Sequence, residues 1–123
     1  MWKILVIDDD LDLVEVTKIV LEKNGFKVAS ANDRVSGMDA VLAEKPDLIL
    51  LDVMMDEDDD GIVLAQDIRR KGIKTPIIML SNINAVSGMK FGADSEMVPV
   101  NEFVEKPIKP DVLIGKIKAL LGK

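Results

Sequence analysis

Four places in this chain carry side chains whose types and spacing could do chemistry. An acidic run at residues 8–10, then Asp52, Ser81 and Lys106, each come directly after a short apolar segment. Carboxylate oxygens are the hard ligands that Mg²⁺ prefers, and a carboxylate can attack phosphorus to form an aspartyl phosphate. The set therefore predicts a magnesium site beside a nucleophilic carboxylate, and Asp52 is the candidate nucleophile.

A plainer explanation of the acidic run is helix capping, because an acid at a helix N-terminus stabilises the helix by about 0.3–1 kcal/mol. One aspartate is enough for that purpose. Placing Asp52 against Asp8 and Asp9 costs of order 4 kcal/mol per like-charged pair at about 4 Å and an effective dielectric near 20. A divalent cation offsets this repulsion, so we favour a cation site held by these acids.

Ser81 and Lys106 suit the recognition of a phosphoryl group, since an ammonium and a hydroxyl can both contact phosphoryl oxygens. Taken alone, Lys106 would be read as a surface residue and Ser81 as a turn residue. The chain has no histidine and no glycine-rich phosphate-binding motif of the Walker type. The phosphoryl donor is therefore expected to come from another molecule.

Composition limits the possible functions further. The 123 residues are 48% hydrophobic and 31% charged, which predicts one folded domain over residues 1–123 without an output domain. A net charge of −6 disfavours direct binding to nucleic acid or anionic lipid. With neither cysteine nor histidine, disulfides, Cys/His zinc sites and histidine-based triads are excluded. There is no apolar run of membrane-spanning length and no signal-peptide pattern, so we expect a cytoplasmic protein.

The elements that must position these residues follow a repeating pattern. Five short apolar segments alternate with amphipathic stretches that have helical spacing, and these segments are residues 2–7, 26–31, 47–51, 76–80 and 102–105. The pattern predicts an α/β fold, (βα)₅, with an open, doubly wound parallel sheet and helices on both faces. Such sheets bind ligands at the carboxyl ends of their strands, where the candidate residues stand.

The helix boundaries are predicted from capping residues. Asn24-Gly25 closes the first helix, Asn32 or Asp33 opens the second, and the third stops at Lys71-Gly72. The last helix enters through Pro110 and ends at Gly122. Residues 83–91 have room only for a short fourth helix.

The sequence resembles the response-regulator receiver domain of two-component signalling over essentially its whole length. The segments that carry the resemblance are residues 4–10, 46–55, 76–81, 92–94 and 105–107. The resemblance implies the flavodoxin-like strand order 2-1-3-4-5. It also implies that Asp52 is the phosphoacceptor, that Lys106 contacts the phosphoryl group, and that a partner histidine kinase or phosphotransfer protein is the donor.

The resemblance further implies that Asp8, Asp9, Asp52 and the main-chain carbonyl of Met54 hold Mg²⁺. Ser81 and the aromatic Phe103 match the residues that move together when the family is phosphorylated, which is a population shift between two packings. The chain is therefore identified as a stand-alone switch that accepts a phosphoryl group and changes which protein it binds. It would catalyse its own phosphorylation and dephosphorylation only.

Four features depart from the usual family pattern. Residues 56–60 form an acidic loop, which we interpret as a solvated turn, and Asn82 replaces a small residue beside the phosphoryl site. Residues 95–101 are interpreted as an inserted loop or turn. Lys109 stands where a helix-capping residue is usual.

Two other functions remain as alternatives. A phosphorylation-independent binding module would be expected to have lost an acid or the lysine, yet Asp8, Asp9, Asp52, Ser81 and Lys106 are all present. A phosphohydrolase of the haloacid-dehalogenase type also uses an aspartate nucleophile and Mg²⁺. Residues 10–14 fit its acid-x-acid-x-Val pattern superficially, but its nucleophile should directly follow the strand.

Overall fold

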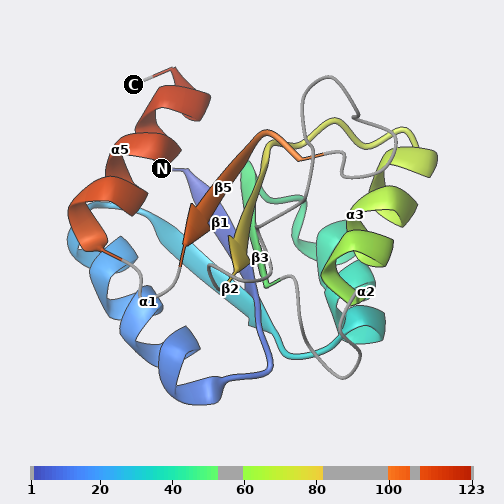
Figure 1. The fold of residues 1–123 in the computed structure, drawn as a ribbon, viewed down its shortest axis with the longest axis horizontal. Helices are drawn as coiled ribbons and strands as arrows, with labels where there is room; N and C mark the ends of the chain where they lie inside the picture. Colours follow the sequence, from blue (N-terminus) through green and yellow to red (C-terminus); the bar gives the residue numbers. More distant parts are fainter. Residues whose placement is uncertain (1, 53–59, 82–99, 106–108, 123) are drawn as a thin grey trace.

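The computed structural model describes residues 2–52, 60–81, 100–105 and 109–122, and it shows one sheet with helices on both faces (Figure 1). Five parallel strands lie in the order β2-β1-β3-β4-β5. The strands are Lys3–Ile7 (β1), Lys27–Ala31 (β2), Leu48–Asp52 (β3), Ile77–Ser81 (β4) and Glu102–Glu105 (β5). The predicted α/β class and the strand order are confirmed.

The helices of the described residues form two layers. They are Leu11–Lys23 (α1), Arg34–Glu44 (α2), Asp60–Arg70 (α3) and Pro110–Leu121 (α5). Figure 1 shows α1 and α5 on one side of the sheet and α2 and α3 on the other. Asp60, which was expected to be the last residue of an acidic turn, is instead the first residue of α3. Aspartate is a favoured residue type at a helix start, which accounts for the difference.

The strands supply both cores because their side chains alternate between the two faces. Leu5, Ile49 and Met79 belong to the core under α2 and α3. Ile4 and Leu50 belong to the core under α1 and α5. All five residues of β3 are buried, as expected of a central parallel strand that is covered on both faces.

The predicted helix ends agree with the structure. Asp33 caps α2 by accepting a hydrogen bond from the Ser36 amide, and Gly72 follows α3 with a positive φ of 82°. Lys109 makes no side-chain cap to α5. Lys45, the cap residue at the end of α2, has a left-handed φ of 48°, a conformation that no local signal predicted.

Several predictions fall on residues that the structure does not describe. They are the short fourth helix at residues 83–91, the acidic loop at 56–59, Asn82, and residues 95–99 of the expected insertion. Over the described part of the chain, the helices are too short and too polar for any of them to cross a membrane.

Candidate functional site

The sheet register places the candidate acids at one edge. Ile7 on β1 pairs with Leu51 on β3, so Asp8 and Asp52 are the next residues on two neighbouring strands. The Asp8 amide donates to the Ala31 carbonyl oxygen at 3.1 Å, which keeps the Asp8 backbone against the end of β2. Both carboxylates are thus fixed by the central strands rather than by a loop.

Three carboxylates meet at this edge. One carboxylate oxygen each from Asp8, Asp9 and Asp52 lies within 4.8 Å of the others. Asp8 is fully buried and Asp52 is 4% exposed, whereas Asp9 is exposed to solvent. This arrangement combines two buried acids with one that faces the approach from solvent.

Asp10 has a different role from its two neighbours. Its carboxylate accepts a hydrogen bond from the Leu13 amide at 3.1 Å and so caps α1, while its own amide donates to Asp8 Oδ1 at 3.0 Å. The capping explanation of the acidic run therefore holds for its last residue. It does not explain the position of Asp8 and Asp9 against Asp52.

The donor set fits a hard divalent cation. Each of the three acids offers a carboxylate oxygen, and the burial of Asp8 and Asp52 makes their mutual repulsion costly without a positive charge nearby. Mg²⁺ is bound in proteins by one or two carboxylates and retains several waters or phosphate oxygens. The site is consistent with that mode of binding.

Of the remaining candidate residues, Ser81 and Phe103 lie in the part of the chain that the structure describes. Ser81 is the last residue of β4 and pairs with Glu105 on β5, which brings its backbone to the same edge as Asp52. Phe103 is buried, 8% exposed, in the core under α2 and α3. Lys106 and Met54 lie outside the described residues.

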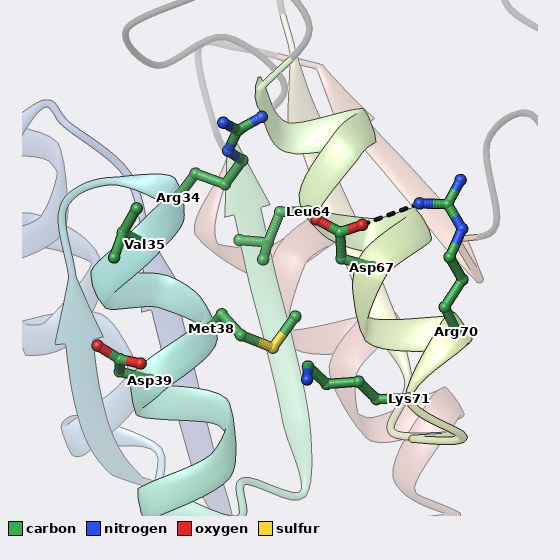
Figure 2. Close-up of a pocket in the computed structure, with 8 residues that line it drawn as sticks. All are labelled: Arg34, Val35, Met38, Asp39, Leu64, Asp67, Arg70 and Lys71. Carbon is green, nitrogen blue, oxygen red and sulfur yellow. Dashed lines mark hydrogen bonds and ion pairs between the residues drawn. The ribbon is translucent and has the colours of Figure 1, made fainter.

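A groove between α2 and α3 is lined by residues of these two helices and by Lys71, and not by Asp8, Asp9 or Asp52 (Figure 2). It has a volume of about 490 Å³, and Met38 and Leu64 contribute to its apolar lining. In Figure 2, Asp67 on its wall is joined to Arg70 by an ion pair of 3.0 Å. Its lining includes three cationic and two acidic side chains, so it carries little net charge.

No motif in the sequence marked Arg69, which lies at the end of α3. Its guanidinium donates to the carbonyl oxygens of Ile73 and Thr75 at 2.9 and 2.8 Å and to Asn101 Oδ1 at 3.1 Å. Burial of the guanidinium lowers its pKa from the ordinary value for arginine. An arginine in the last turn of a helix is a weak signal for such carbonyl contacts.

Comparison with known proteins gives one consistent family. The family model described as "Response regulator receiver domain" matches residues 4–118. The transcriptional regulatory protein CseB of Streptomyces coelicolor is 37% identical over 98% of this chain and 49% of its own length. The alkaline phosphatase synthesis transcriptional regulatory protein PhoP of Bacillus subtilis is 34% identical over the same shares. The chain thus spans about half the length of these curated relatives.

Solved structures agree with this result. The receiver domain of the Francisella response regulator 1452 superimposes with a TM-score of 0.86 at 28% identity, covering 99% of this chain and 98% of that one. The receiver domain of NtrX from Brucella abortus gives a TM-score of 0.84 at 26% identity, covering 98% of each chain.

Proposed function

The chain belongs to the response regulator receiver domain family, and on that premise we propose that it is a signalling switch that accepts a phosphoryl group on Asp52. The observation that carries the proposal is the cluster of Asp8, Asp9 and Asp52, with carboxylate oxygens within 4.8 Å of one another. Asp52 is buried at the end of a fully buried strand, so its position is fixed before any partner arrives.

The donor is a phosphohistidine on a partner kinase or phosphotransfer protein. A carboxylate oxygen of Asp52 attacks phosphorus, the phosphorus–nitrogen bond breaks, and the imidazole leaves with the bonding electron pair. Asp8, Asp9, Asp52 and the Met54 main-chain carbonyl would hold Mg²⁺, which would supply positive charge to stabilise the transferring group. The Lys106 ammonium and the Ser81 hydroxyl contact the remaining phosphoryl oxygens.

The output of the switch is a change in protein binding. Ser81 ends β4 and Phe103 lies on the neighbouring strand β5, so a contact between Ser81 and the phosphoryl group can be passed to the core that holds Phe103. The two packings of these residues are the two states of the switch. The net charge of −6 supports a protein surface, rather than nucleic acid, as the direct target of this domain.

The proposal is tested by intact-protein mass after incubation with acetyl phosphate, with Mg²⁺ and with a chelator. We expect one phosphoryl adduct that depends on Mg²⁺ and is absent from Asp52→Asn. Asp47→Asn is the matched control, because Asp47 also lies beside β3 but accepts a hydrogen bond from the Lys3 amide at 2.8 Å, away from the cluster.

Loss of the adduct in both variants, or its retention in Asp52→Asn, would contradict the assignment of Asp52. Absence of labelling in the native chain, together with no response to beryllofluoride, would favour the binding module that works without phosphorylation. Turnover of a generic phosphomonoester would instead favour a phosphohydrolase.

A further inference from the structure

The start of β5 is held by a hydrogen-bonded clasp at the amino-terminal ends of the strands, opposite the acidic cluster at their carboxyl ends. The clasp consists of Arg69 and Asn101 with the backbone groups that they bind. Arg69 Nη2 donates to Asn101 Oδ1 at 3.1 Å, while Arg69 Nη1 donates to the carbonyl oxygens of Ile73 and Thr75. One guanidinium therefore joins the end of α3, the segment leading into β4 and the residue before β5.

Asn101 also pairs with the first residue of β4. The backbone N–H of Asn101 donates to the Ile77 carbonyl oxygen at 2.9 Å. The side-chain Oδ1 of Asn101 accepts from the backbone N–H of Ile77 at 2.9 Å. These two bonds extend the β4–β5 ladder by one step before its first Cα pair, Ile78 with Glu102. The side chain of Asn101 thus sets the point at which β5 begins to pair.

Within the sheet formed by the described residues, β5 is held in register by one neighbouring strand only. β5 is the last strand in the sheet order, and four residue pairs join it to β4, its neighbour. A slip of one residue would move the strand by about 3.3 Å and turn Phe103 from the core under α3 to the opposite face. An edge strand, which has hydrogen bonds to one neighbouring strand only, benefits from an added lock at its start.

We propose that Arg69 and Asn101 are positioning residues for phosphoryl transfer, acting through the register of β5. This inference rests on the proposed function, in which Lys106, the residue directly after β5, contacts the phosphoryl group. The register that the clasp sets also brings Glu105 level with Ser81 at the other end of the strand. A clasp at the start of β5 therefore helps to set the register at its end, where the chain leads into Lys106.

The clasp has no share in holding the cation. Asp8 and Asp52 are placed by β1 and β3, and the bonds of the clasp reach neither strand. Loosening the clasp should therefore slow transfer without weakening Mg²⁺ binding. General destabilisation of the domain would weaken both together.

The test compares Asn101→Ala with Asn101→Asp in the native chain. The alanine variant loses the acceptor for both Arg69 and Ile77, whereas aspartate keeps an oxygen in that place. We expect labelling by acetyl phosphate at saturating Mg²⁺ to slow about tenfold or more in Asn101→Ala, because small displacements of a positioning group are costly. Asn101→Asp should label close to the native rate, and calorimetric titration should give an unchanged Mg²⁺ Kd for both variants.

Native labelling rates in Asn101→Ala would overturn the inference while leaving the proposed function intact. Slower labelling accompanied by an equal loss of Mg²⁺ affinity would also overturn it. Absence of labelling in the native chain would contradict the proposed function itself, and the inference with it. If Asn101→Ala does not fold, Arg69→Gln decides the question by the same two measurements, because it leaves the Asn101–Ile77 pair in place.

Discussion

The ionisation of Asp33 makes the stability of the start of α2 depend on pH. Its Oδ1 accepts hydrogen bonds from the Ser36 amide at 2.7 Å and from the Ser36 hydroxyl at 2.8 Å. Both bonds favour the charged carboxylate, the amide contributing most, and they hold the pKa of Asp33 below its ordinary value. Ionised Asp33 therefore stabilises the folded chain.

We expect this contribution to disappear in acid. Because the folded-state pKa of Asp33 is lowered, its stabilising effect is complete above the ordinary aspartate pKa and is lost as the pH falls through the folded-state value. In the variant Asp33→Asn, the side-chain carbonyl can still accept the Ser36 amide hydrogen but does not titrate. Urea denaturation of both proteins at a series of pH values should show the native advantage shrinking only in the acidic range. A difference that stays constant with pH would contradict the assignment.

The close packing of α2 depends on a glycine. A Cβ added at Gly37 would lie 3.0 Å from Leu64 Cδ2 and 3.1 Å from Ile7 Cγ2. Both neighbours are fully buried, so neither can move aside easily. Gly37 therefore lets α2 approach both β1 and α3.

Substituting this glycine should destabilise the fold. Gly37→Ala gains about 0.5–1 kcal/mol of helix propensity, but overpacking typically costs about 1–3 kcal/mol, so we expect a net loss near 1 kcal/mol. Gly115→Ala is the matched control, because Gly115 lies within α5 with open space around it. That variant should be stabilised by about 0.5–1 kcal/mol. Chemical denaturation measures both, and equal effects of the two substitutions would exclude the packing argument.

The helices and strands were predictable because each depends on a local pattern. The apolar segments at 2–7 and 26–31 match β1 and β2 within one residue, since covered parallel strands read as short apolar runs. The acids at the strand ends were predictable for a related reason, because parallel strands share one carboxyl edge. The Arg69–Asn101 clasp was not, since it joins the end of α3, the segment leading into β4 and the residue before β5, which only the folded chain brings together.

The molecule as a whole combines two cores with a cluster of acids at the carboxyl ends of the strands. The two hydrophobic clusters share the strands β1, β3, β4 and β5 and anchor them between the two helix layers. Asp8 and Asp52 are carried on this frame with carboxylate oxygens within 4.8 Å of each other, so their charges repel. The stability of the whole domain should therefore depend on what binds between the acids.

We expect Mg²⁺ to raise the unfolding temperature of the native chain. In the absence of Mg²⁺, we expect Asp52→Asn to have a higher unfolding temperature than the native chain. A cation at about 100 times its Kd adds about 2.7 kcal/mol to the free energy of unfolding. Removing the Asp52 charge relieves repulsion with the buried Asp8 of order 3–4 kcal/mol at 4.8 Å and an effective dielectric near 20, and a smaller repulsion with the exposed Asp9. With a chelator the variant should therefore be the more stable protein, and with Mg²⁺ the native chain should gain more.

Thermal unfolding followed by circular dichroism checks this prediction, with NaCl at matched ionic strength as the control for screening. Asp33 lies outside the cluster, so Asp33→Asn should respond to Mg²⁺ as the native chain does. Equal gains in the native chain and Asp52→Asn would mean that the ion acts elsewhere on this acidic protein. If, in the presence of a chelator, Asp52→Asn is less stable than the native chain, the folded site already balances the Asp52 charge without a divalent cation.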